Sequence, residues 1–469
     1  MICVAAKHSI DLTKGPVVKK LVIFAFPILL ANLLQQLYQC ADTYVVGNYA
    51  VEKEISLAAV GSTASITNLF LNLFLGLAVG ANVVCANLYG SGKHESLRRT
   101  MHSSLIIAAV SGVVIGIAGY FATPFLLDKV MHSPSEVLPQ ATDYMQIVFL
   151  GQPASLLFNF GAGILRAHGD TKRPMYILIT TGLINVLLNL LFVIRLKMDA
   201  AGVALATVVA LYLSASAVLY ILFHAHGEYR LTVKELRVSK KETIDIVKVG
   251  VPCGLNGIVF SLSNVLIVKE VNELGKIVLA GNTAASNVDT MTYQIIAAFY
   301  SAAVSFSGQN YGAKNLKRID KLFLWSSILS IGLILLTDAF LFLFPQFFVG
   351  IFSKNQAAVS VGVSRVFMMG AGYVLYCVSE MAIGCCRGMG KSLMPTVLNA
   401  FFICVPRIVW VLAFYPLLVT ADKPYNYVML LWCYPISWAL SAIAQAISYF
   451  YYRKVEAKRF AAEADSVST

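Results

Sequence analysis

An acidic residue inside an apolar stretch is the first feature of this sequence that could do chemistry. Residues 21–48, LVIFAFPILLANLLQQLYQCADTYVVGN, are apolar enough to cross a bilayer, which takes roughly 20 residues, yet they include Asp42 near the far end. An aspartate at a helix centre costs on the order of 2.5–3.5 kcal/mol on insertion scales, so its presence favours a cavity that something enters. The alternative is a helix cap near the outer membrane interface.

The same stretch includes a proline and two further polar side chains below the aspartate. Pro27 removes a backbone donor and bends a helix, so we expect a hinge there. Gln35 lies seven residues before Asp42 and Tyr38 four residues before it, so both share its helix face. Together with Asn159 on a later segment, they are candidates for lining a substrate cleft. Packing between helices is the competing interpretation for each.

The composition indicates that most of the chain lies in a membrane. Of its 469 residues 58% are hydrophobic and only 13% are charged, against about 25% charged residues in soluble proteins. The apolar segments are long and continuous, which excludes the short alternating strands of a membrane barrel. The sequence therefore predicts an all-α membrane protein with twelve transmembrane helices. The predicted spans are roughly 18–46, 55–88, 98–122, 138–165, 174–195, 201–224, 245–273, 278–309, 320–344, 358–385, 393–419 and 427–452.

Charge predicts how the spans are oriented. With the N-terminus inside, most of the 36 Lys and Arg residues fall in the inner connections, so both termini are expected in the cytoplasm. The net charge of +12 then reflects membrane topology and lipid contact, and no nucleic-acid partner is expected. The nine Cys residues have no metal-ligand or disulfide spacing, which predicts free thiols and no structural metal.

Two halves of the chain share landmarks at a nearly constant offset. LYGSGKHESLRR resembles NYGAKNLKRIDK, and ILRAHGDTKRPM resembles CCRGMGKSLMPT. Arg166 and Pro174 recur 221 residues later as Arg387 and Pro395. Six spans per half give both halves the same orientation, which predicts two six-helix bundles related by a parallel pseudo-two-fold repeat. The expected domains are an N-terminal bundle (1–224), a cytoplasmic linker (225–241), a C-terminal bundle (242–452) and a cytoplasmic tail (453–469).

These motifs, taken in order, resemble the multidrug and toxic compound extrusion (MATE) family of secondary transporters over nearly the whole chain. The marks are FPILLANLLQQLYQCADTYVVGNY, LYGSGK, ILRAHGDTKRPM, GLINVLLNLLFV and GVALAT, followed by GQNYGAKN, CCRGMGKSLMP and ICVPRIVW. The DinF-like branch, with its essential acid on the first helix, fits best, because no acid follows Pro252 before Glu270. The resemblance implies a V-shaped pair of bundles that exports organic, often cationic or amphipathic, compounds against inward Na⁺ or H⁺.

The resemblance also implies a cation-binding or coupling cluster in the first bundle. It maps onto Asp42, Asn185, Asn189 and Thr207, and the sequence departs from the family where Asn189 replaces a common aspartate. Asn185 and Asn189 are four residues apart and therefore share a helix face. Oxygen ligands from one carboxylate, two amides and a hydroxyl suit a hard cation. A lone carboxylate in an apolar cleft could instead carry a proton, and hydrogen bonds that join helices are the alternative to both.

The second bundle contains its own charged residues. Glu380 and Arg407 fall on neighbouring predicted spans and could form a structural ion pair, or a second proton-linked site. Arg365 and Arg407 are the basic residues placed inside predicted spans, whereas Asp289 and Asp338 are expected near the outer interface.

The sequence therefore predicts a cation-coupled efflux antiporter. It would act as a monomer in the inner membrane of a bacterium, with lipids and small organic substrates as partners and no cofactor beyond the coupling ion. A lipid-linked saccharide flippase of the same superfamily is the alternative within transport, although it calls for a strongly cationic cleft. A membrane-embedded enzyme is the alternative of another class, and the seven scattered His residues argue against it.

Overall fold

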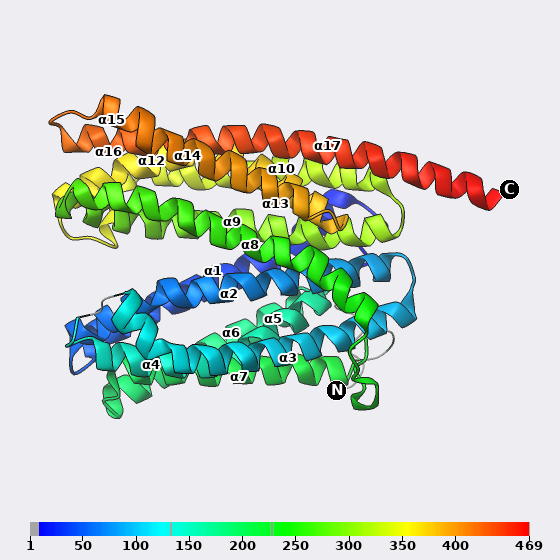
Figure 1. Cartoon of the computed structure of the whole chain (residues 1–469), viewed down its shortest axis with the longest axis horizontal. Helices are drawn as coiled ribbons and strands as arrows, with labels where there is room; N and C mark the ends of the chain where they lie inside the picture. Colours follow the sequence, from blue (N-terminus) through cyan, green and yellow to red (C-terminus); the bar gives the residue numbers. More distant parts are fainter. Residues whose placement is uncertain (1–8, 132–133, 226, 228, 469) are drawn as a thin grey trace. The chain divides into compact units, whose positions relative to one another are not determined.

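The structure is a computed structural model that describes residues 9–131, 134–225, 227 and 229–468. Within these residues all regular secondary structure is helical, as the sequence predicts (Figure 1). In the part of the chain that the structure describes, nine helices are long and apolar enough to cross a membrane, or ten if the bent pair Leu138–Leu150 and Gln152–Ala167 forms one span. The two other predicted spans correspond to α2 (Lys53–Gly90) and α9 (Lys276–Gly312), helices of 38 and 37 residues. Every predicted span is thus helical.

Contacts divide the chain into two compact units. Unit 1 comprises residues 1–11 and 26–254, and unit 2 comprises residues 12–25 and 255–469. The helices that lie wholly in unit 1 are α2, α3 (His94–Phe125), α4 (Leu138–Leu150), α5 (Gln152–Ala167), α6 (Lys172–Asn189) and α7 (Asp199–Phe223). Those wholly in unit 2 are α9, α10 (Leu316–Leu343), α11 (Pro345–Gly350), α12 (Gln356–Gly388), α13 (Leu393–Asn399), α14 (Val405–Val409), α15 (Tyr415–Leu418), α16 (Lys423–Leu431) and α17 (Cys433–Ser468).

The two units repeat the same order of helices. Each repeat opens with a long helix that contains a proline: α1 (Val17–Tyr49) contains Pro27, and α8 (Lys240–Glu273) contains Pro252. A π-helical segment also recurs, as η3 (Leu190–Arg195) in unit 1 and as η6 (Trp410–Phe414) 220 residues later. The prolines and the π-helical segments recur at equivalent places in the two units, which supports the repeat inferred from the sequence.

The unit boundaries run through α1 and α8, whereas the predicted domain boundaries lie on either side of the connection 225–241. Residues 12–25 of α1 and its leading segment belong to unit 2, and residues 240–254 of α8 belong to unit 1. Glycines explain why residues 240–254 pack with unit 1. A Cβ on Gly76 would lie 2.1 Å from the backbone N of Gly254, and one on Gly80 would lie 2.4 Å from the carbonyl O of Ile246. Only glycine lets α2 approach α8 so closely.

The segment before α1 is held in unit 2 by an arginine. Arg318 donates hydrogen bonds to the carbonyl oxygens of Leu12, Lys14 and Gly15 at 2.9, 2.8 and 2.7 Å. Gln309 accepts a further hydrogen bond from the backbone N–H of Leu12 at 3.0 Å. The planar fork of the guanidinium suits three carbonyls that converge at a chain turn. Arg318, at the start of α10, therefore holds the segment before α1 in place.

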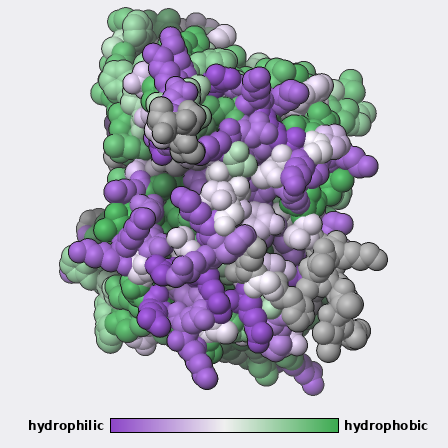
Figure 2. Space-filling model, turned by 90° about the vertical axis from the view of Figure 1, so that its right-hand side faces the viewer, coloured by the Kyte–Doolittle hydropathy of each residue, from purple (hydrophilic) through white to green (hydrophobic). Residues whose placement is uncertain are grey.

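Polar and apolar surfaces are segregated. The face shown in Figure 2 is covered mainly by hydrophilic side chains, with hydrophobic ones along its margins. The helices of both units expose many large apolar side chains, such as Phe121 in α3, Leu187 in α6, Leu335 in α10 and Ile447 in α17. Apolar side chains exposed along long helices are typical of lipid-facing surfaces.

Candidate functional site

Three helices of unit 1 bring the four predicted coupling residues together. Asp42 lies on α1, Asn185 and Asn189 lie on α6, and Thr207 lies on α7. Asn189 donates from Nδ2 to Oδ1 of Asp42 at 2.5 Å and to Oδ1 of Asn185 at 3.3 Å. Asn185 in turn donates from Nδ2 to Oγ1 of Thr207 at 3.3 Å. A hydrogen bond between Thr207 and Asp42 closes the ring of side chains.

One oxygen of this cluster has no partner among the described residues. Oδ1 of Asn189 is buried without a hydrogen bond, and the residue as a whole is fully buried. A buried acceptor without a donor is costly, on the order of 1–3 kcal/mol, and calls for an ion, a proton donor or a water. The α-helical part of α6 also ends at Asn189, where η3 begins. Such π-helical segments are frequent at functional sites.

Apolar side chains close one end of the cluster. Val45 and Val46 of α1, with Ala50 just beyond its end, pack against Val193 of η3 and Val203 of α7. All five are at most 4% exposed. This packing holds the end of α1 against η3 and α7, about one helical turn beyond Asp42.

Two neighbouring cavities of unit 1 share lining residues, and the first of them reaches the cluster. The first, of about 130 Å³, is lined by Asp42, Asn185, Thr207, Gln35 and Tyr38, among others. The second, of about 140 Å³, is lined by Asn159 and again by Gln35. The three predicted cleft residues thus line these two neighbouring cavities inside unit 1. Each cavity is smaller than the roughly 300 Å³ of a drug-sized pocket, so each admits ions, waters or part of a larger ligand.

The ring of Tyr38 packs directly against α6 at Gly182. A Cβ on Gly182 would lie 1.8 Å from Cε2 of Tyr38, so only glycine leaves room for the ring in this position. The Tyr38 hydroxyl donates to the carbonyl O of Ile179 at 3.3 Å. No sequence pattern links Tyr38 with Gly182, although a glycine in the middle of an apolar helix often marks a close approach.

The predicted ion pair between Glu380 and Arg407 is wrong. No ion pair within 4.0 Å joins them in the described part of unit 2. Arg407 instead donates to Ser437 at 3.2 Å and to Asn264 at 3.1 Å, and its guanidinium lies 4.5 Å from the centre of the Tyr434 ring. Glu380 hydrogen-bonds Tyr376 and interacts electrostatically with Arg387. Neutral polar groups and aromatic faces, rather than a carboxylate, therefore surround Arg407.

A buried ion pair of unit 2 joins Asp289 to Arg365, a pairing that the sequence analysis did not predict. Nε of Arg365 donates to Oδ2 of Asp289 at 2.6 Å, and both side chains are 11% exposed. Arg365 also donates to Oδ1 of Asn282 at 2.7 Å, and the hydroxyl of Tyr427 donates to the same oxygen at 2.9 Å. Asp289 lies on α9 and is buried against Arg365 of α12. Because Asp289 and Arg365 both lie inside predicted spans, the sequence contained a signal that the two could pair.

Two positions of the second repeat that correspond to the predicted coupling residues are apolar. At the offset of the two prolines, Asp42 corresponds to Ile267. At the offset of η3 and η6, 220 residues, Asn189 corresponds to Val409. Apolar residues at both places mean that the cluster is a property of the first half alone.

A protein-family model matches both halves of the chain. The family, described as MatE, matches residues 27–191 and 252–411. These two segments begin at Pro27 and Pro252, the prolines of α1 and α8.

Relatives of similar length are known in several bacteria. The chain is 28% identical to "Probable multidrug resistance protein YpnP" of Bacillus subtilis, over 85% of this chain and 88% of the relative. It is 22% identical to "Probable multidrug resistance protein NorM" of Thermotoga maritima, over 83% and 84%. It is 26% identical to "DNA damage-inducible protein F" of Escherichia coli, over 67% of each chain.

Solved structures share the fold. The outward-facing conformation of a multidrug resistance MATE family transporter covers 95% of this chain and 98% of its own, with a TM-score of 0.87 at 23% identity. Structures of a MATE protein described as straight and as bent align with TM-scores of 0.87 and 0.84, at 23% and 22% identity. The likeness supports the predicted architecture of twelve helices in two bundles.

Proposed function

Because the chain belongs to the MatE family of multidrug and toxic compound extrusion transporters, we propose that it exports organic cations or amphipathic compounds in exchange for H⁺ or Na⁺. The observation that carries the proposal is the ring of Asp42, Asn185, Asn189 and Thr207 beside a cavity. It offers one negative charge and neutral oxygens, where an ion can be bound and released.

Ion binding at this ring is coupled to rotation of one amide. In the structure the Nδ2 group of Asn189 faces Asp42, so a cation at Asp42 would meet a positive dipole. Turning the amide by half a turn brings Oδ1 of Asn189 to Asp42, where it can coordinate Na⁺ or accept a hydrogen bond from a protonated carboxyl. The same rotation breaks the hydrogen bond from Asn189 to Asn185. Arrival of the ion thereby reorganises the contact between α1 and α6.

Pro27 is the proposed hinge through which this change reaches the rest of α1. The boundary between the two contact units falls between residues 25 and 26, next to Pro27. Asp42 lies fifteen residues beyond it, about 22 Å along the helix. The part of α1 that carries Asp42 can therefore reorient while residues 12–25 stay with unit 2. Pro27→Ala is expected to slow efflux without loss of folding, and efflux at the wild-type rate would remove the hinge from the mechanism.

The proposed setting is the inner membrane of a bacterium, with the protein acting as a monomer. Bacterial relatives support it, and the bias of basic residues toward one set of connections supports cytoplasmic termini. Cysteine labelling of residues near each terminus in intact cells and in inverted vesicles tests the orientation. Labelling of both termini in intact cells only would contradict it.

Proteoliposomes with imposed gradients test the transport proposal. The purified protein is reconstituted, and efflux of a fluorescent organic cation is followed under a pH gradient and, separately, under a Na⁺ gradient. Asp42→Asn should abolish gradient-driven efflux. Asp128→Asn is the matched control, because Asp128 is half-exposed and forms its ion pair with its neighbour Lys129. Efflux by Asp42→Asn at the wild-type rate under both gradients would remove Asp42 from the coupling mechanism.

A further inference from the structure

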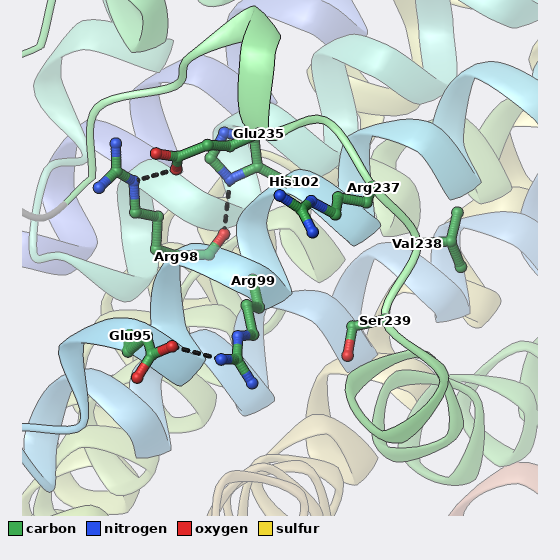
Figure 3. Close-up of a pocket in the computed structure, with 8 residues that line it drawn as sticks. All are labelled: Glu95, Arg98, Arg99, His102, Glu235, Arg237, Val238 and Ser239. Carbon is green, nitrogen blue, oxygen red and sulfur yellow. Dashed lines mark hydrogen bonds and ion pairs between the residues drawn. The ribbon is translucent and has the colours of Figure 1, made fainter.

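A third cavity lies where the start of α3 meets the connection between the two halves. It has a volume of about 530 Å³. α3 contributes Glu95, Arg98, Arg99 and His102, and the connection contributes Glu235, Arg237, Val238 and Ser239 (Figure 3). All of these residues belong to unit 1. They lie at the end of α3 that faces the viewer in Figure 2.

Hydrogen bonds hold the connection firmly against α3. His102 is 1% exposed, and its Nδ1 meets the carbonyl O of Arg98 at 2.7 Å, while its Nε2 accepts from the backbone N–H of Thr232 at 3.1 Å. Ser103 donates to the carbonyl O of Arg237 at 3.3 Å and accepts from the N–H of Ser239 at 2.9 Å. The cavity therefore has a fixed frame on both sides, although one wall is an irregular segment.

The lining of the cavity has an excess of positive charge. Arg98 pairs with Glu235 at 2.6 Å, and Arg99 pairs with Glu95. The guanidinium of Arg237 has no hydrogen bond or ion pair among the described residues, and Figure 3 shows it inside the ring of lining side chains. Both ion pairs are substantially exposed, so each contributes little stability and can rearrange. An arriving anion thus finds one unpaired guanidinium and two more that can turn toward it.

The same connection exposes apolar side chains among its basic ones. Val233 is 70% exposed, Leu236 is 39% exposed and Val238 is 56% exposed. Lys234 and Arg237 alternate with them. Basic and apolar residues interleaved on one exposed segment are typical of a surface that lies at the membrane interface and contacts lipid. A free inorganic anion would make no favourable contact with these apolar side chains.

We propose that this cavity binds the phosphodiester headgroup of an anionic phospholipid, with Arg237, Arg98 and Arg99 around the phosphate and Val238 beside the start of the acyl chains. Guanidinium groups suit phosphate because their planar forks donate two parallel hydrogen bonds. Because the connection links the two halves, a bound lipid would tie the start of α8 to the membrane surface.

Lipid titration of the purified full-length protein tests the proposal. Native mass spectrometry in detergent counts bound phosphatidylglycerol and bound phosphatidylcholine, and inorganic phosphate is added as a competitor. The wild-type protein should retain phosphatidylglycerol in preference to phosphatidylcholine. Arg237→Gln should weaken phosphatidylglycerol binding about ten-fold, the loss expected for one charge-assisted hydrogen bond. Lys234→Gln is the control, because it removes an equal charge three residues away and does not line the cavity.

Each other outcome overturns the assignment. Equal weakening in Arg237→Gln and Lys234→Gln would mean a diffuse charge effect with no defined site. Equal retention of both lipids would exclude recognition of the anionic headgroup. Binding of inorganic phosphate that Arg237→Gln abolishes, without retention of phosphatidylglycerol, would assign the cavity to a free anion instead. Glu235→Gln provides a converse test, since loss of the competing carboxylate should tighten lipid binding, and weaker binding would contradict the proposal.

Discussion

The side-chain amide of Asn189 donates a hydrogen bond of 2.5 Å from Nδ2 to Oδ1 of Asp42. The amide thus occupies the position where a second acid would face the carboxylate of Asp42. Two carboxylates at this separation repel unless they share a proton or hold a cation. The amide removes that requirement, so the ring holds a single acidic group.

Asn189→Asp should therefore make efflux depend on Na⁺. The second carboxylate restores charge beside Asp42 and favours a bound cation of fixed charge. We expect several-fold stimulation of efflux by Na⁺ at constant pH in proteoliposomes, with little stimulation of the wild-type protein. Asn48→Asp, an exposed change at the end of the same helix, should show no such stimulation. Identical Na⁺ responses in the wild-type protein and in Asn189→Asp would contradict this role of the amide.

Gly182→Ala should slow transport without unfolding the protein. The new Cβ would push the Tyr38 ring away from α6, toward the cavity beside Asp42, and would break the contact of Tyr38 with Ile179. Alanine itself favours the helix by about 1 kcal/mol, so little stability should be lost. Efflux rate and thermal unfolding in detergent are the two measurements. Gly332→Ala, where a Cβ has open space, should leave efflux unchanged. Wild-type efflux by Gly182→Ala would mean that the position of the Tyr38 ring is unimportant.

Asp289→Asn should destabilise unit 2. The change leaves the guanidinium of Arg365 buried without its carboxylate, at a cost on the order of 3–5 kcal/mol. Thermal unfolding in detergent should show a clear drop. Asp320→Asn breaks the more exposed pair with Arg453 and should cost no more than about 1 kcal/mol. Replacing both Asp289 and Arg365 by apolar residues should recover part of the loss, and equal stability of all these variants would refute a structural role for the pair.

Stability should fall in mild acid because of His168. This residue follows α5, outside the spanning segments, and is 2% exposed, with rings of Tyr89 and Tyr229 at centroid distances of 4.8 and 4.9 Å. Burial lowers the pKa of His168 from 6.5 to about 4. Between these values the unfolded chain binds a proton that the folded protein does not, so stability is lost as pH falls from 6.5 toward 4.

The expected loss from this one group is on the order of 3 kcal/mol. Thermal unfolding of wild-type protein and of His168→Phe, measured from pH 7 to pH 4, isolates its contribution. The substitution should flatten the dependence in this range, because phenylalanine takes up no proton and can keep the ring contacts. His94→Phe is the control, since His94 lies at the exposed start of α3. An unchanged pH dependence in His168→Phe would exclude this residue as the cause.

Much of the architecture is determined by the sequence alone. Long apolar segments can satisfy their backbone groups in a bilayer only as helices, so their length and number predict the spans. The recurrence of Arg166 as Arg387, and of Pro27 as Pro252, reveals the repeat because such landmarks are independent of packing. The four-residue spacing of Asn185 and Asn189 places both on one face, and this local rule held in the structure.

Partners across helices were decided only by tertiary structure. The sequence places Glu380 and Arg407 on neighbouring spans, but the rotation of each helix about its axis determines which side chains meet. In the fold Arg407 faces Ser437 and Asn264, whereas Arg365 faces Asp289. The assignment of residues 240–254 to unit 1 depended on the contact of Gly76 with Gly254. These contacts join residues on different helices, 30 or more positions apart in the sequence. They form only where close-packed surfaces fit, which no local pattern encodes.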